Sequence, residues 1–84
     1  MTLEQKAEIA RRAIERDYPN KDIGKLIHFG RLGDDDFFGS ELTERLLNDY
    51  GAIRVGNDGK HDRLDSFDFM PVWKNSRFVA FDNA

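Results

Sequence analysis

The sequence contains no cysteine, no long apolar run and only two histidines, and each of these shortages excludes a class of protein. Without cysteine, neither disulfides nor thiolate metal sites can stabilise the chain, so its 84 residues depend on aliphatic and aromatic packing. No stretch approaches the ~18 apolar residues of a membrane span, and the amino terminus has no apolar run behind basic residues. We therefore expect a single cytoplasmic domain, residues 1–84, with one core.

Motifs that would support catalysis or cofactor binding are also missing. Ser40, Ser66 and Ser76 lie outside any G-x-S-x-G pattern, and "GRLG" lacks the lysine and hydroxyl of a phosphate-binding loop. His28 and His61 do not form a closely spaced pair of the kind that zinc sites use. The sequence therefore predicts a protein without enzymatic activity, cofactor or metal.

The segment "NDGKHD", residues 57–62, has the polar composition of a calcium loop but not its spacing. A calcium loop needs a bidentate glutamate at its twelfth position, and no glutamate follows Glu44 in the sequence. A β-hairpin turn with Gly59 at positive φ accounts for the same residues, so we predict a turn here.

An amino-terminal helix is the clearest structural prediction. Thr2 and Gln5 have the spacing of a capping box, apolar residues follow at helical spacing, and Pro19 ends the helix. Residues 21–30 are ambiguous, because their apolar spacing fits either a helix or a short buried strand. Asn20 as a possible N-cap favours the helix.

A further helix is predicted at residues 41–50. Ser40 has the position of its N-cap, and Gly51 that of a left-handed residue after its end. Asp34 to Asp36 precede this segment, where carboxylates favour the positive end of a helix dipole. Helix-end chemistry would thus account for part of the aspartate run.

In the second half of the chain the apolar residues alternate, which indicates strands. Strands are predicted at residues 53–55 and 63–69, which form a hairpin, and at residues 77–81. Pro71 has no backbone donor for a sheet ladder, so residues 70–73 are expected at an edge strand or bulge.

These elements predict an α+β fold in which two or three amino-terminal helices precede a small carboxy-terminal antiparallel sheet. In order of elements, residues 2 to about 69 resemble a winged helix, although no motif accompanies this topological likeness. The resemblance implies a third helix that enters the DNA major groove in nucleic-acid-binding members. Here that helix carries three acids against one arginine, and a duplex would repel it.

Charge is divided unevenly along the chain. Residues 1–33 carry seven Lys/Arg and five acids, residues 34–68 carry four and ten, and residues 69–84 carry two and one. The middle segment is therefore −6, whereas the flanks sum to +3. Such an asymmetry bears on binding partners and association rates.

The leading functional hypothesis is a small non-enzymatic module that docks through this acidic surface on a basic protein partner. It would act as an inhibitor or regulator of, for example, a nucleic-acid-binding protein, and in the extreme case as a nucleic-acid mimic. Trp73 is the expected aromatic anchor. The predicted partner-binding residues are Asp34, Asp35, Asp36, Glu41, Glu44, Asp49, Asp58, Asp62 and Trp73.

Two alternatives stay open. In one, the chain binds nucleic acid through basic residues of the first helix. Those residues are Lys6, Arg11, Arg12 and Arg16. In the other, Asp34 to Asp36 hold a hard cation such as magnesium in a small metal-dependent enzyme.

Overall fold

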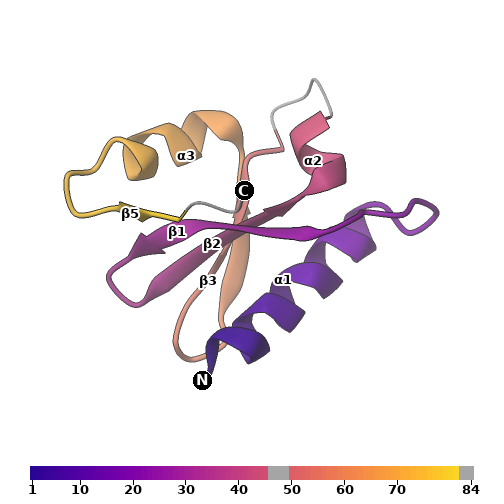
Figure 1. The fold of residues 1–84 in the computed structure, drawn as a ribbon, viewed down its shortest axis with the longest axis horizontal. Coiled ribbons are helices and arrows are strands. Elements are labelled where there is room, and N and C mark those ends of the chain that lie inside the picture. The colour runs from indigo at the N-terminus through magenta and orange to yellow at the C-terminus, as the bar shows by residue number, and fades with distance from the viewer. Residues whose placement is uncertain (46–49, 82–84) are drawn as a thin grey trace.

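The computed structural model describes residues 1–45 and 50–81, in which three helices and five strands form an α+β fold (Figure 1). The elements in chain order are α1 (Leu3–Asp17), β1 (Leu26–Leu32), β2 (Asp35–Ser40), α2 (Glu41–Arg45), β3 (Ala52–Val55), β4 (His61–Leu64), α3 (Ser66–Trp73) and β5 (Val79–Ala80). The strands form one antiparallel sheet in the order β4-β3-β2-β1-β5. The α1 helix covers one face of the sheet, and α2 and α3 lie on the other side (Figure 1).

This arrangement corrects the predicted order of elements. A single helix precedes the sheet, four of the five strands come before α3, and the last strand follows α3. The prediction of two or three amino-terminal helices before a carboxy-terminal sheet is therefore wrong, and the winged-helix likeness ends with it. Within the residues that the structure describes, no helix combines the length and apolar character needed to cross a bilayer.

The predicted amino-terminal helix is confirmed. Gln5 N donates to Thr2 Oγ1 at 3.2 Å and Thr2 N donates to Gln5 Oε1 at 2.8 Å, which forms the reciprocal capping box. The helix ends at Asp17, before Pro19. Its buried side chains pack on the sheet. The core on this face consists of Ala10, Ala13, Ile14, Ile23, Phe38, Tyr50, Ile53 and Val55.

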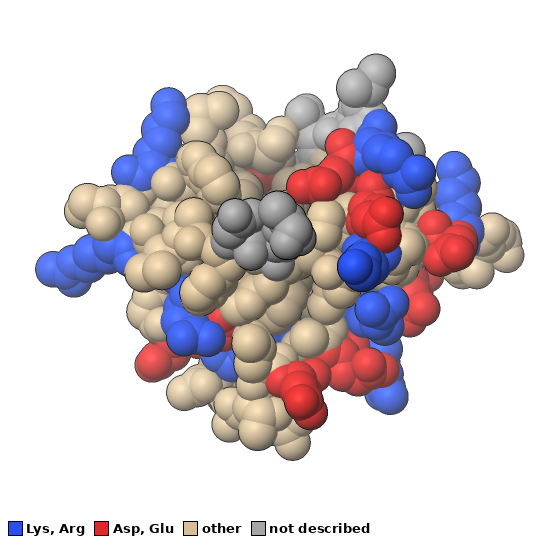
Figure 2. Space-filling view, viewed as in Figure 1, with Lys and Arg blue, Asp and Glu red and all other residues tan. Residues whose placement is uncertain are grey.

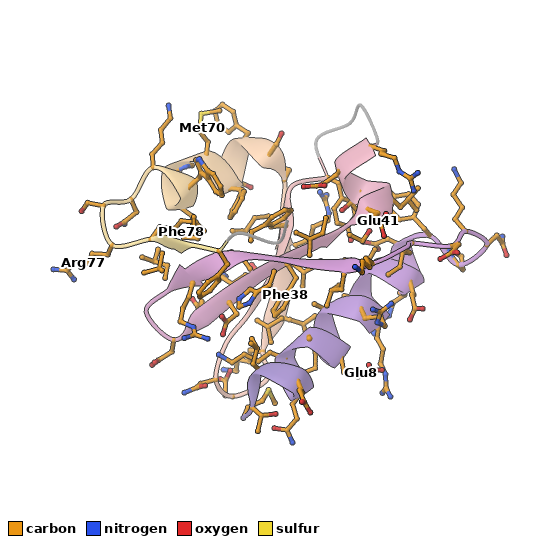
Figure 3. All side chains as sticks on the ribbon, viewed as in Figure 1. Glu8, Phe38, Glu41, Met70, Arg77 and Phe78 are labelled. Atoms are coloured by element: carbon orange, nitrogen blue, oxygen red, sulfur yellow. The ribbon has the colours of Figure 1, made fainter. Side chains whose placement is uncertain are left out.

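Aromatic rings fill the space between the opposite face of the sheet and α3. The ring centroid of Phe69 in α3 lies 5.9 Å from that of Phe29 and 5.6 Å from that of Phe37. Phe78 contacts Phe37 and Phe69 from the segment that joins α3 to β5. Figure 3 shows Phe38 on the side of α1 and Phe78 on the side of α3, so the sheet is covered on both faces.

The helix favoured at residues 21–30 is wrong, because this segment leads into β1. Gly24 has a φ of +74°, which breaks a right-handed helix, and Asn20 lies in a turn and does not cap one. β1 pairs with β2 from Leu26 opposite Ser40 to the end of the hairpin. Pairing with a distant strand outweighs the helical spacing of a few apolar residues.

The aspartate run does not precede a helix. Asp34 lies in the turn between β1 and β2, and Asp35 and Asp36 are the first residues of β2. The interpretation of these carboxylates as helix-dipole partners is therefore wrong. A strand forms because Phe37 and Phe38 are buried on opposite faces of the sheet, as consecutive strand residues are.

The helix predicted after Ser40 is shorter than expected. Ser40 does act as the cap, since Thr43 N donates to Ser40 Oγ at 3.2 Å and Ser40 N donates to Thr43 Oγ1 at 2.8 Å. The helix ends at Arg45, and residues 46–49 of the prediction lie outside the described residues. Gly51 has the predicted left-handed φ, +78°, but Tyr50 before it is not helical.

The predicted hairpin is confirmed in its first strand and its turn, where Gly59 has a φ of +84°. Its second strand ends at Leu64, so the strand predicted over residues 63–69 is wrong in its second half. Asp65 Oδ1 accepts a hydrogen bond from Asp68 N at 2.7 Å and thereby starts α3.

Pro71 lies within α3, so residues 70–73 form part of a helix and not the predicted edge strand or bulge. The last predicted strand is confirmed in a shorter form, as β5 pairs with β1 at Gly30 and Arg31.

Gly30 lies where β5 and Phe78 approach β1. A Cβ atom added at Gly30 would overlap the Val79 carbonyl oxygen and would lie 2.5 Å from Phe78 Cζ. We expect Gly30→Ala to lower the free energy of unfolding by about 1–3 kcal/mol, because the added methyl overpacks this contact. Denaturant unfolding followed by circular dichroism measures the change.

Gly33→Asn provides the control, since Gly33 has a φ of +62° that asparagine tolerates and no atom within 4 Å of an added Cβ. Its effect should stay within about 0.5 kcal/mol. Equal effects of the two substitutions would contradict the close approach at Gly30.

Candidate functional site

The aspartate run divides between solvent and interior. Asp34 is exposed, Asp35 is half-buried, and Asp36 exposes only 1% of its surface. Asp36 on β2 faces α1, because it shares its face of the sheet with Phe38 and Val55 of the core. The docking hypothesis requires Asp36 to lie on the surface, and it does not.

Three basic side chains surround the Asp36 carboxylate. Lys6 Nζ of α1 lies 2.9 Å from Oδ2, and His28 Nε2 and Arg31 Nε of β1 lie 2.7 Å and 3.0 Å from Oδ1. Lys6, only 4% exposed, also donates to the Asp34 carbonyl oxygen at 2.7 Å. We call Lys6, His28, Arg31 and Asp36 the Asp36 cluster.

The cluster keeps Asp36 ionised. Burial raises the pKa of the Asp36 carboxyl, but hydrogen bonds from Lys6, Arg31 and His28 outweigh burial and hold that pKa below its ordinary value. Because an ionised carboxylate only accepts hydrogen bonds, His28 Nε2 carries the proton that it donates. The His28 ring also stacks on Phe38, with 4.7 Å between the centroids.

The cluster bears on both alternatives to protein docking. Lys6 is committed to Asp36, which leaves Arg11, Arg12 and Arg16 of the basic residues proposed to contact phosphate, and Arg12 pairs with Glu8 at 3.0 Å. Basic side chains occupy the oxygens of Asp36, and over residues 1–45 and 50–81 no three or more His, Cys, Asp or Glu side chains are grouped to hold a metal ion. Neither alternative gains support from this geometry.

A second set of predicted residues lies at the β3–β4 hairpin. Asp35, Asp58 and Asp62 line a shallow hollow of about 390 Å³ together with Arg54 and Lys60. Arg54 donates to both oxygens of Asp62, at 2.9 Å and 2.7 Å, and the hydrogen bond to Asp62 is the main reason why the pKa of the Arg54 guanidinium is raised. Lys60 Nζ lies 3.9 Å from Asp58. Basic neighbours thus offset much of the negative charge here.

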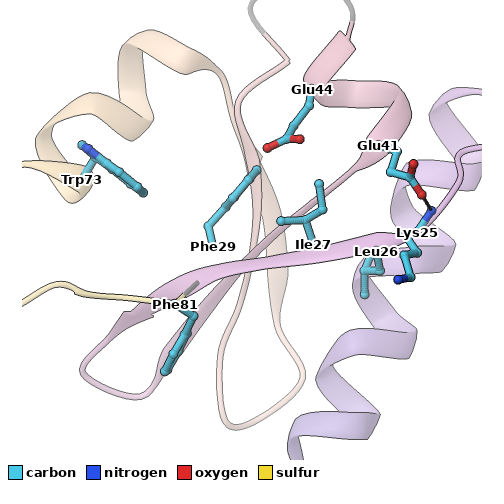
Figure 4. Close-up of a pocket in the computed structure, with 8 residues that line it drawn as sticks. All are labelled: Lys25, Leu26, Ile27, Phe29, Glu41, Glu44, Trp73 and Phe81. Atoms are coloured by element: carbon cyan, nitrogen blue, oxygen red, sulfur yellow. Dashed lines mark hydrogen bonds between the residues drawn. The ribbon is translucent and has the colours of Figure 1, made fainter. Parts of the chain in front are cut away.

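The remaining described candidates, Glu41, Glu44 and Trp73, meet in one groove beside β1, between α2 and α3 (Figure 4). The groove has a volume of about 490 Å³, and Ile27 and Phe29 of β1 form its apolar floor. Lys25, Leu26 and Phe81 complete its lining. We call it the α2–α3 groove.

The polar groups of the groove lie at different points along it. Glu41 Oε1 accepts a hydrogen bond from Lys25 N at 2.6 Å, and Figure 4 shows these two residues together at one end. Glu44 lies between that end and Trp73, and its carboxylate points over Ile27 and Phe29 (Figure 4). Among the described residues, no ion pair involves Glu44.

Two rings hold Trp73 in place at the other end of the groove. Its centroid lies 6.0 Å from that of Phe69 and 5.4 Å from that of Phe78. About half of its surface, 52%, is exposed. Trp73 is thus an exposed aromatic residue, as predicted, but it projects from a helix and not from an edge strand.

The predicted acidic surface is not continuous. Asp35 begins β2, and Glu41 follows its last residue. The carboxylates at the β3–β4 hairpin and those in the α2–α3 groove therefore lie at opposite ends of a six-residue strand, roughly 20 Å apart. Figure 2 shows acidic and basic side chains interspersed on the displayed face. Asp49 lies outside the described residues.

The sequence alone missed the partners of Asp36 and the floor of the groove. Lys6 could have been found, because it precedes Ala10 and Ile14 at four-residue spacing on the buried side of α1. No local signal shows that Phe29 and Trp73 line one groove, since their proximity depends on where α3 packs on the sheet.

Replacing Asp36 alone should destabilise the fold far more than replacing Asp36 and Lys6 together. Asp36→Leu leaves Lys6 buried without its counter-ion, and we expect it to lower the free energy of unfolding by about 3–5 kcal/mol or to unfold the chain. The double variant Lys6→Met/Asp36→Leu removes both charges and should recover most of that loss in denaturant unfolding. A double variant as unstable as Asp36→Leu would contradict the pairing.

The lowered pKa of Asp36 also predicts a pH dependence. A carboxyl whose pKa is lower in the folded than in the unfolded state stabilises the fold above its unfolded pKa, and this contribution is lost as pH falls through the folded pKa. The melting temperature should therefore decrease as the pH is lowered below about 4. The fall should be smaller in Lys6→Met/Asp36→Leu, and identical profiles would show that Asp36 does not cause it.

Comparison of the chain with protein-family models, curated proteins and solved structures finds no match. The α2–α3 groove and the surface around it are therefore the features of the described residues that bear on function.

Proposed function

We propose that the protein is a small non-enzymatic module that binds a partner protein through the α2–α3 groove and the outer surface of α3. The main support for this proposal is that α3 exposes large apolar side chains to solvent. Phe67, Met70 and Trp73 recur at three-residue spacing in this eight-residue helix and expose 80%, 49% and 52% of their surface. Figure 3 shows Met70 on the side of α3 away from the sheet.

Large exposed side chains grouped beside a groove are typical of interaction sites, whereas scattered apolar residues are not. None of the α3 residues is buried, so the outer side of this apolar helix is not needed to fill the core. Tryptophan is among the residues that contribute most to binding energy at interfaces. In Figure 2 the surface over α3 and β5 is mostly uncharged, with two basic side chains projecting from it, and its uncharged part suits contact with an apolar surface.

The carboxylates of Glu41 and Glu44 favour a partner with positive charge at this site. A basic protein, for example a nucleic-acid-binding protein that the module inhibits or regulates, fits this charge. Nucleic-acid mimicry is not part of the proposal, because mimicry needs a continuous acidic field and the carboxylates lie in separate groups. The hairpin group of Asp35, Asp58 and Asp62 therefore has no role in it.

Substitutions on the outer surface of α3 test the proposal. The immobilised protein captures binding proteins from an extract of its native host, and calorimetry measures the affinity of each purified candidate. Phe67→Ala/Met70→Ala should weaken binding of the partner at least about tenfold, because interface anchors contribute 1.4 kcal/mol or more. Phe67 is largely exposed and Met70 is about half exposed, so the fold should persist.

Leu3→Ala is the matched control, since Leu3 is an exposed apolar residue of α1, on the opposite face of the sheet. It should leave binding unchanged. Equal binding of the partner by the unchanged protein, by Phe67→Ala/Met70→Ala and by Leu3→Ala would contradict the proposal. So would sedimentation data showing that Phe67 and Met70 join two copies of this chain.

A further inference from the structure

The α2–α3 groove combines the carboxylates of Glu41 and Glu44 with an apolar, aromatic wall. Glu44 points over Ile27 and Phe29, between the two ends of the groove (Figure 4). Trp73 lines the end next to Phe29, and Lys25 lies at the other end with Glu41 (Figure 4). We infer that the Trp73 end of the groove binds an arginine side chain of the partner, with the guanidinium against the aromatic rings and hydrogen-bonded to Glu44. The inference rests on the proposed function and names the side chain that the partner inserts.

Charge favours a cation at this point of the groove. Glu44 is exposed at the groove, so an incoming cation can reach its carboxylate, and the two opposite charges attract each other. Glu41 already accepts the Lys25 backbone N–H, whereas no ion pair with the described residues compensates Glu44. Glu44 is therefore the carboxylate that an incoming cation would meet.

Shape and chemistry favour arginine over lysine. A guanidinium is planar, weakly hydrated and able to stack on an aromatic face while it donates two hydrogen bonds to one carboxylate. A lysine ammonium is a compact and strongly hydrated charge. The alkyl part of an arginine would lie along Ile27. The volume of about 490 Å³ is enough for one such side chain and its flanking residues.

The chain already uses the same recognition within its own fold. Arg31 Nε donates to Asp36 at 3.0 Å, while its guanidinium carbon lies 5.7 Å from the centroid of the Phe81 ring. Arg31 is thus held by one carboxylate and one aromatic ring. In the groove, Glu44 and Trp73 present the same pair of groups, and an arginine from the partner would complete the arrangement.

Short blocked peptides test the inference without an identified partner. Acetyl-Gly-Val-X-Val-Gly-amide is titrated into the isotope-labelled protein at low salt, with X as arginine, lysine or citrulline, the uncharged analogue of arginine. Saturable shifts should appear at the Trp73 indole N–H and at Ile27 and Phe29. Dissociation constants near ~1 mM are expected for so small a contact, with arginine at least about fivefold tighter than lysine and tenfold tighter than citrulline.

Glu44→Gln keeps the shape of the side chain and removes its charge. It should weaken binding of the arginine peptide at least about fivefold and leave the citrulline peptide unchanged. Asp34→Asn is the control, because Asp34 is an exposed carboxylate outside the groove, and it should change neither affinity.

Several results would overturn the inference. These are equal binding of arginine and citrulline peptides, equal binding of arginine and lysine peptides, insensitivity to Glu44→Gln, shifts located away from the groove, or no saturable shift up to ~10 mM peptide. If one of these results is found but binding of the partner protein still depends on Phe67 and Met70, the proposed function stands. The group that enters the groove is then not an arginine side chain. If the peptides bind as expected but no partner depends on α3, the proposed function fails and the arginine site stands.

Discussion

The rest of the structure depends on the ionised carboxylate of Asp36, which lies between the sheet and α1. A buried charge requires a partner from the elements that pack around it. Here α1 supplies Lys6, and β1 supplies His28 and Arg31. Because desolvation of these groups offsets much of their attraction, the cluster adds little net stability, yet each member is needed once the others are buried. It ties the position of α1 to the pairing of β1 with β2.

With α1 fixed on one face, the other face is left to a short apolar helix. Phe29, Phe37 and Phe78 form the surface on which α3 rests through Phe69. Only one side of this helix faces the sheet, so its outer side chains stay exposed, and α2 stands apart from it across the groove. The exposed apolar surface and the groove are thus two results of the same packing, which is why we propose that they form one binding site.

Features set by neighbouring residues could be predicted from the sequence, whereas features set by distant contacts could not. The capping box of Thr2 and Gln5 and the turn at Gly59 are local, and both are present. β1 and α3 are too short for the period of their apolar residues to decide between helix and strand, so pairing with β2 and the Asp65 cap decide instead. Likewise, Asp34 and Asp36 look alike in a charge count, although one is exposed and the other is buried.

The attachment of β5 has a consequence for how the molecule opens. This strand pairs with β1 at two residue positions, and none of the side chains of the helix before it is fully buried. Segments with so little buried surface separate from a domain at a lower free energy than its core does. The carboxy-terminal unit of α3 and β5 should therefore exchange its amide hydrogens sooner than the α1 side of the sheet. A ligand seated between α2 and α3 would slow that exchange, so part of its binding energy would be spent on local ordering.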